Sequence, residues 1–93
     1  MFDFYELAKK KLDLSDKTIS LAKEIVSRFK KGKSDEAGVV ASAVYLAGRI
    51  TGENRSQATV AEALGTTEMT MRTNIYRRGM LKIAVALSES ESH

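Results

Sequence analysis

Apolar side chains recur every three or four positions along much of this chain, and this interval lines up side chains on one face of an α-helix. The clearest example runs from Ile19 through Ala22 and Val26, with Ser15 placed before it as an N-cap. Gly32 is expected to end this helix, after two lysines in its last turn. Comparable patterns predict four more helices, over about 2–12, 35–51, 56–64 and 68–78.

One predicted helix differs from the others because it is apolar on nearly every side. Residues 39–50 read VVASAVYLAGRI. A helix with so little polar surface is normally surrounded by other helices. Its alanines and Gly48 allow neighbours to approach closely, while its length and Arg49 argue against a membrane span. We therefore expect it to be the central helix of a bundle.

The chain after Gly79 is expected to add one last packed segment. Residues 80–87 read MLKIAVAL, and their periodicity does not separate a helix from a short strand, although an all-helical context favours a helix. Residues 88–93 read SESESH and are expected to form a disordered acidic tail. A chain of 93 residues has room for one domain. The prediction is an all-α protein with a single domain over 1–87, a bundle of about five helices.

Composition fits a folded intracellular protein and narrows the chemistry available to it. Hydrophobic residues make up 43% of the chain and charged residues 29%, the balance of a globular protein. The sequence has no cysteine, which excludes disulfides and thiolate metal ligands, and its single histidine is His93. No phosphate-binding loop, metal-ligand spacing or paired nucleophile and base is recognisable. We expect neither an enzyme nor a bound cofactor.

Residues 56–78 have the sequence pattern of a helix-turn-helix, a motif that often binds DNA. Such a unit needs a small residue where its helices cross, a glycine in the turn and an apolar residue that packs back on the first helix. Ala61, Gly65 and Met71 meet these needs. The same spacing is common in ordinary helical bundles, and Thr66 stands where an apolar residue is usual. A bundle with no role in DNA binding is therefore the alternative.

Arginines gather around this helical pair, which suggests an acidic partner. With Met71 and Ile75 turned inward, the outer face of the second helix is expected to offer four side chains to the bases of a major groove: Met69, Arg72, Thr73 and Tyr76. Flanking side chains are expected to contact phosphates, and this set comprises Arg55, Ser56, Gln57, Thr67, Arg77 and Arg78. The net charge of +3 permits a nucleic-acid partner without requiring one.

Three stretches of the chain resemble a known family. The segments AGVVASAVYLAGRITGENR (37–55) and SQATVAEALGTTEMTMR (56–72) are similar to the second cyclin-like repeat of archaeal transcription factor B, the relative of eukaryotic transcription factor IIB. Upstream, FYELAKKKLDLSDKTISLAKEIVSRFKKGKS (4–34) matches the way that repeat begins, including its Gly-Lys-Ser connection. The resemblance covers nearly the whole chain.

The resemblance implies a five-helix cyclin-like fold whose last two helices form the helix-turn-helix. It implies that this unit reads double-stranded promoter DNA just upstream of the TATA box, while the protein also contacts the TATA-binding protein. RNA polymerase is a further candidate partner, and the setting is the archaeal cytoplasm at the nucleoid, with no membrane contact. By position, Met69 and Arg72 fall where the family contacts bases, with Thr73 beside them. Lys33 and Ser34 fall in the connection that approaches the DNA backbone.

The chain also departs from the family pattern. Ile75 takes the place of a tyrosine, so that Tyr76 follows one position late. The zinc ribbon and the first cyclin-like repeat are absent from the sequence, which leaves an excised C-terminal domain and a small stand-alone relative as two expectations. Two other functions also stay open: a cyclin-like protein-interaction module and a small self-associating helix-turn-helix repressor.

Overall fold

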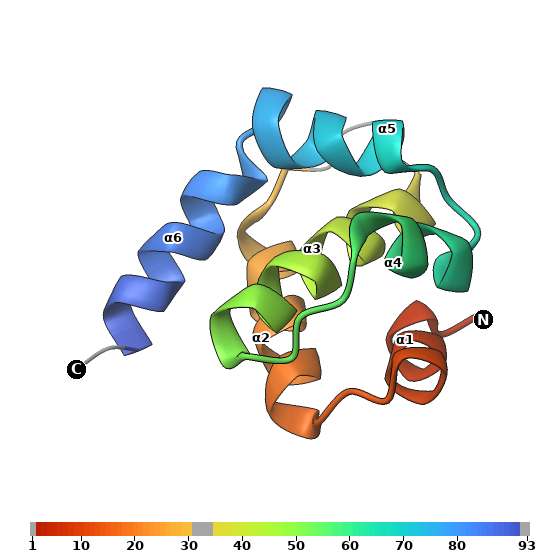
Figure 1. Ribbon diagram of the computed structural model, residues 1–93. Helices are drawn as coiled ribbons and strands as arrows, with labels where there is room; N and C mark the ends of the chain where they lie inside the picture. Colours follow the sequence, from red (N-terminus) through yellow and green to blue (C-terminus); the bar gives the residue numbers. More distant parts are fainter. Residues whose placement is uncertain (1, 31–34, 92–93) are drawn as a thin grey trace.

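Six α-helices and one π-helical turn make up the described part of the protein (Figure 1). The structure is a computed structural model, and it describes residues 2–30 and 35–91. In chain order its elements are α1 (Phe4–Leu12), α2 (Asp16–Arg28), α3 (Glu36–Thr51), α4 (Gln57–Leu64), α5 (Glu68–Arg72), the π turn η1 (Thr73–Arg77) and α6 (Met80–Glu91). The predicted all-α class is confirmed. No helix in the described ranges is long and apolar enough to cross a membrane.

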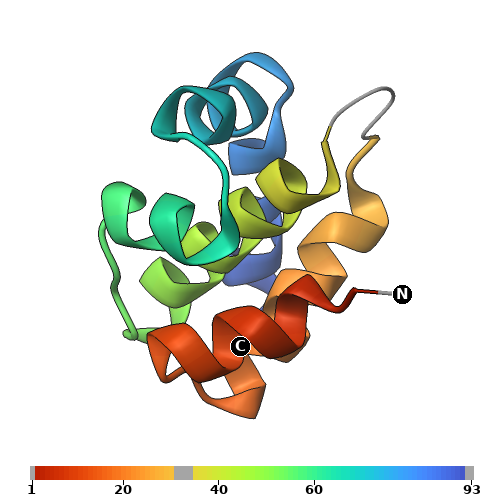
Figure 2. The same cartoon turned by 90° about the vertical axis from the view of Figure 1, so that its right-hand side faces the viewer.

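Helix α3 lies at the centre of the bundle, as its apolar sequence predicted. Its residues 37–44 and 46–48 are all buried. The five other α-helices and η1 all contact it. Figures 1 and 2 show it running through the middle of the molecule, and Figure 1 shows α1 and α6 far apart on either side. Burial of this nearly continuous apolar surface supplies much of the free energy that holds the bundle together.

Two glycines of α3 mark the places where neighbouring segments come closest to its backbone. A Cβ atom at Gly38 would lie 2.5 Å from Thr70 Cγ2, and one at Gly48 would lie 2.6 Å from the carbonyl oxygen of Glu53. Both distances are well inside van der Waals contact. The absence of a side chain therefore allows α5 to dock at one end of α3, and the α3–α4 loop to cross it at the other.

Side-chain caps begin several of the helices, and the one at Ser15 confirms the predicted N-cap. Ser15, Ser56 and Thr67 each accept a hydrogen bond from the backbone amide three residues on, at the starts of α2, α4 and α5. Asp35 caps α3 in the same way. Each such cap satisfies an amide that has no partner within its helix.

The end of α2 differs from the prediction. This helix ends at Arg28, and Phe29 follows in extended backbone with its side chain in the core. The expected last turn through Lys30 is therefore not formed, because the extended backbone at Phe29 interrupts helical hydrogen bonding before Lys30. Lys31 and Gly32, which belong to the same prediction, lie outside the described residues.

The C-terminal segment is a helix, and it extends further than predicted. Met80, Ala84 and Leu87 are buried at spacings of four and three, so they hold α6 against the bundle. The helix continues for one turn to Glu91, where residues 88–91 had been expected to belong to a disordered tail. The described chain thus has six α-helices where five were expected, and the α4–α5 pair is followed by another helix.

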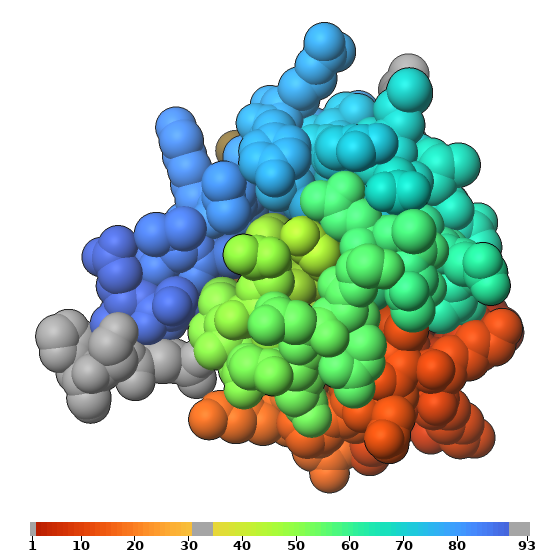
Figure 3. Space-filling view, viewed as in Figure 1, coloured from red at the N-terminus to blue at the C-terminus, as the bar shows by residue number. Residues whose placement is uncertain are grey.

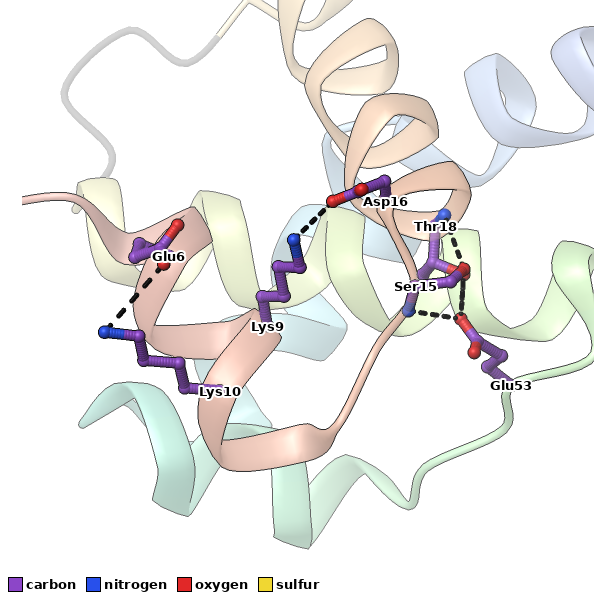
Figure 4. Close-up of polar contacts among 7 residues, drawn as sticks. All are labelled: Glu6, Lys9, Lys10, Ser15, Asp16, Thr18 and Glu53. Carbon is purple, nitrogen blue, oxygen red and sulfur yellow. Dashed lines mark hydrogen bonds and ion pairs between the residues drawn. The ribbon is translucent and has the colours of Figure 1, made fainter.

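A cluster of polar contacts joins α2 to the loop between α3 and α4 (Figure 4). Glu53 Oε1 accepts hydrogen bonds from the Ser15 backbone amide over 3.0 Å, from Ser15 Oγ over 2.9 Å and from the Thr18 hydroxyl. Thr18 is fully buried, and its hydroxyl also lies 2.7 Å from that of Thr51. These hydrogen bonds, the one from Thr18 foremost, hold the pKa of Glu53 below its ordinary value.

Replacing Glu53 with Gln is expected to lower stability near neutral pH and to remove part of the stability loss in acid. Because the folded-state pKa of Glu53 is lowered, its contribution is present above the unfolded-state pKa and is lost as pH falls through the folded value. Wild-type and Glu53→Gln proteins should therefore differ in urea unfolding near pH 7 and converge as pH falls through the lowered folded-state pKa of Glu53. Glu62→Gln, which changes an exposed glutamate of α4, is the control. A constant difference at all pH values would show that the charge on Glu53 is not what stabilises the loop.

Candidate nucleic-acid interface

The outward side of α5 and η1 carries the four side chains that were expected to read bases. Met69, Arg72, Thr73 and Tyr76 line one hollow in the surface, together with Arg77. Met69 is 75% exposed and Tyr76 60%, and large apolar side chains exposed side by side are typical of an interaction surface. We call these five residues the outer face. In Figures 1 and 3 the segment that carries it forms the top edge of the molecule.

The opposite side of the same segment is buried. Met71 and Ile75 are 0% and 1% exposed, as their spacing predicted, and Asn74 is 2% exposed. Helix α5 contacts α3 and α4, while η1 contacts α3 and α6. The segment is therefore anchored along one side and presents the outer face on the other.

The second helix of the pair is not a continuous α-helix. After Arg72 it adopts a π pattern over Thr73–Arg77, in which the Arg78 amide donates to the Thr73 carbonyl, five residues back, over 3.0 Å. A π turn holds about one residue more than an α turn, so the residues after it are turned by roughly 100° relative to an uninterrupted helix. This turn contains Tyr76, the residue that follows one position late in the family pattern.

A chain of polar contacts joins the buried side of this segment to α3. Asn74 Nδ2 donates to Ser42 Oγ over 3.4 Å, and Ser42 Oγ donates to the Gly38 carbonyl over 2.7 Å. Ser42 is fully buried. Buried polar groups without partners are costly, so these contacts favour one orientation of the segment on α3.

Two predicted contact residues use their polar atoms within the protein. The Thr73 hydroxyl donates to the Met69 carbonyl over 3.0 Å, within the helix. The Arg55 guanidinium donates to three carbonyls, those of Leu12 over 2.9 Å, Asp13 over 3.2 Å and Asn54 over 2.9 Å. Arg55 thus ties the end of α1 to the segment before α4, away from the outer face. Its contact with phosphate stays a prediction.

The remaining residues expected near phosphates on α4 and α5 lie at helix starts. Ser56 and Thr67 are exposed N-caps, and Gln57 is half-buried in the first turn of α4. The hydroxyls of both caps also hydrogen-bond to the threonine three residues on, over 2.8 Å and 3.0 Å. The structure therefore gives Ser56 and Thr67 a local role in beginning a helix, and it leaves both accessible from solvent.

The two arginines at the end of η1 flank the outer face. Arg77 lines its hollow, and Arg78, which is also exposed, lines a second hollow beside it. Both arginines therefore lie beside the outer face, and their contact with phosphate stays a prediction. Lys33 and Ser34, the other predicted phosphate contacts, lie outside the described residues.

The second hollow includes residues that the sequence did not indicate as functional. Its lining comprises Asp35, Thr67, Met69, Thr70, Thr73, Asn74 and Arg78. Asp35, the N-cap of α3, places a carboxylate in the same hollow as Arg78. Asn74 carried a detectable signal, because it stands three positions after Met71 and so falls on the buried stripe. Asp35 could be recognised as a cap, but only the tertiary fold brings it next to α5.

Comparison with known proteins gives one family. The family model described as "Transcription factor TFIIB repeat" matches residues 4–77. Transcription initiation factor IIB of Pyrobaculum islandicum is 44% identical over 66 residues, which is 66% of this chain and 20% of that protein. Transcription initiation factor IIB 1 of Thermoplasma volcanium is 35% identical over 69 residues, 74% of this chain and 22% of the relative. The Pyrococcus furiosus factor is 36% identical over 87 residues, 89% of this chain and 29% of the relative. No solved structure gives a significant match.

The matched segment covers most of the fold. It runs from the start of α1 to the end of η1, so it includes the central helix and the whole outer face, while α6 lies beyond it. The chain spans between a fifth and three tenths of the length of the relatives compared here. The family match extends over well more than half of the sequence, and the chain belongs to the transcription factor TFIIB repeat family.

Proposed function

We propose that this chain is a DNA-binding repeat of a transcription initiation factor and that it reads double-stranded promoter DNA with the outer face. In this proposal α4 and α5 act as a helix-turn-helix, and the α5–η1 segment enters the major groove. Arg72 bonds a guanine edge, Met69 contacts a thymine methyl group, and Thr73 and Tyr76 complete the contact. The TATA-binding protein is the second partner, and RNA polymerase is a further one.

One observation carries this proposal. The outer face combines two exposed apolar side chains and two arginines around a single hollow, whereas the side behind it is buried. A helix that enters a major groove needs one buried side and one exposed side. The buried side packs on the protein, while the side chains of the exposed side reach base edges and phosphates. The relatives are named as transcription initiation factors, which fits a partner of this kind.

A specific observation also favours the protein-interaction alternative. A hollow between α3 and α6 is lined by Leu46, Ile50 and Val85 among others, and Val85 is 47% exposed. An apolar groove of this kind suits a peptide or helix from another protein. Such a module would need no DNA, so duplex binding separates the two functions.

The direct test is the salt dependence of duplex binding. The wild-type chain should bind duplex DNA with an affinity that falls as salt rises, and Arg77→Ala should make the logarithmic slope shallower by about one unit, since one phosphate contact is lost. Fluorescence anisotropy of a labelled duplex across a salt series measures both. If the wild type binds no duplex even at low salt, with or without the TATA-binding protein, the proposal fails.

Arg55→Ala is the matched comparison, because it removes the same charge from a side chain that is bonded within the protein. Since Arg55 donates to three carbonyls, its loss should lower the free energy of unfolding by about 1–2 kcal/mol. Its effect on the salt slope should be smaller than that of Arg77→Ala. A full unit of slope lost in Arg55→Ala would instead restore Arg55 to the phosphate contacts.

A further inference from the structure

The π turn changes which residues of the segment face solvent. In an uninterrupted α-helix a residue seven positions on returns to within roughly 20° of the starting direction. Arg78 stands seven positions after the fully buried Met71, so a continuous helix would turn the Arg78 side chain toward the core. Burial of an arginine is costly. In the structure Arg78 is exposed, and Met80 provides the next fully buried side chain.

Asn74 is the polar side chain that fixes the start of this turn from inside the protein. It is the second residue of η1, is 2% exposed and donates from Nδ2 to Ser42 Oγ. Ser42 is held in turn by the Gly38 carbonyl, where the glycine lets α3 and α5 come into closest contact. The amide group of Asn74 therefore sits at the junction of α3 with the segment, one helical turn before Arg78.

We propose that Asn74 is a positioning residue for DNA recognition: its bond to Ser42 holds the π turn, and the π turn orients Tyr76, Arg77 and Arg78 beside Arg72. This inference rests on the proposed function, and it adds a buried residue behind the outer face to those that set base preference. Without the bond, the segment can return to regular α-helical hydrogen bonding, which rotates the residues after Asn74 relative to those before it.

The test uses two variants that interrupt this contact from either side. Asn74→Leu keeps the number and branching of side-chain heavy atoms but has no donor, and Ser42→Ala removes the acceptor with little change in shape. Thr18→Val is the matched control. Thr18 is also a fully buried, hydrogen-bonded side chain, but it lies on α2, where its hydroxyl bonds Thr51 and Glu53 and not α5. Base preference is measured as the ratio of affinities for a selected site and for its single-base variants, with the TATA-binding protein present.

Asn74→Leu and Ser42→Ala should each reduce that ratio by about fivefold or more, the lower end of what one well-placed base contact contributes. Affinity for scrambled duplex should change little, because the charges are retained. Combining the two substitutions should add little to Ser42→Ala alone, since both break the Asn74–Ser42 bond and Ser42→Ala also removes the contact of Ser42 Oγ with the Met71 carbonyl over 3.4 Å. Thr18→Val should lower the melting temperature and leave the ratio unchanged. If Asn74→Leu does not fold, Ser42→Ala alone must show the loss.

A second measurement reports the turn itself without DNA. In the wild type the Arg78 amide, bonded to Thr73, should exchange slowly with solvent, and amide resonances over 73–78 should shift in both variants. Base preference that persists in both variants while Arg72→Ala abolishes it would overturn this inference and leave the proposed function standing. Absence of any base preference in the wild type would overturn the proposed function and this inference with it.

Discussion

Addition of the TATA-binding protein from the same source is expected to tighten binding of this chain to a promoter duplex by about a hundredfold or more. The outer face offers few side chains, and a single module of this kind buries only roughly 600–1,000 Å² of protein surface on DNA. With a net charge of +3, non-specific attraction adds little. A partner already seated beside the site supplies a second contact and thereby raises the effective concentration of the chain at the DNA. Titration of one labelled TATA-containing duplex, with and without the TATA-binding protein, measures the change.

The same titration separates the competing functions. A self-associating repressor would bind tightly without help and as a dimer, whereas a peptide-binding module would show no response to DNA in either titration. A duplex that lacks the TATA sequence is the control, because the TATA-binding protein cannot then be placed beside the site. Equal affinity in the presence and absence of the TATA-binding protein would rule out the promoter role.

Arg72→Ala is expected to reduce discrimination between the preferred duplex and its single-base variants by about 5- to 150-fold, which corresponds to about 1–3 kcal/mol. Arg72 lies at the centre of the outer face, between Met69 and Tyr76. Its guanidinium can donate two parallel hydrogen bonds to guanine, and Ala leaves those acceptors unpaired. The preferred duplex can be obtained by selection from a randomised pool, followed by competition with each variant.

Arg49→Ala provides the control for lost charge. Arg49 is an exposed arginine on α3, and its guanidinium carbon lies 5.9 Å from the centre of the Tyr45 ring, away from the outer face. It should leave base preference unchanged. Circular dichroism should show the wild-type helix content for both variants. If Arg72→Ala binds more weakly on all sequences by the same factor, Arg72 contacts phosphate and another residue reads the base.

Much of the fold could be predicted from local pattern. The inward positions of Met71 and Ile75 follow from a spacing of four, and the caps Ser15, Ser56 and Thr67 follow from side chains that bond their own helix. The central place of α3 follows from its lack of a polar face. In each case the interaction lies within one helix or is set by which of its faces is apolar, so the sequence alone contains it.

Other features depend on contacts between distant segments and had no local signal. The three carbonyls bound by Arg55 come mostly from a turn more than forty positions away, so its charge alone suggested a surface role. The π turn, in which Asn74 and Ile75 are buried while Arg78 is exposed, lies where η1 contacts both α3 and α6. The last turn of α6 shows that composition alone does not predict where a helix ends. Its serines and glutamates suggested a disordered tail, but they continue the helix beyond the buried Leu87.

The Glu53 contact has a consequence for the order in which the protein assembles. In a capping box, a glutamate three positions after the N-cap accepts a hydrogen bond from the N-cap amide. The N-cap of α2 is Ser15, and the residue three positions on is Thr18. The glutamate that bonds the Ser15 amide is instead Glu53, 38 residues after Ser15. Ser15 caps the Thr18 amide locally, but the Ser15 amide itself finds its partner only where the loop beyond Gly48 has crossed α3. An N-terminal fragment that ends before α3 lacks this contact, so its second helix should fray at the start. The contact thus links the start of this helix to closure of the loop, so part of the stability of a local helix end depends on a long-range contact.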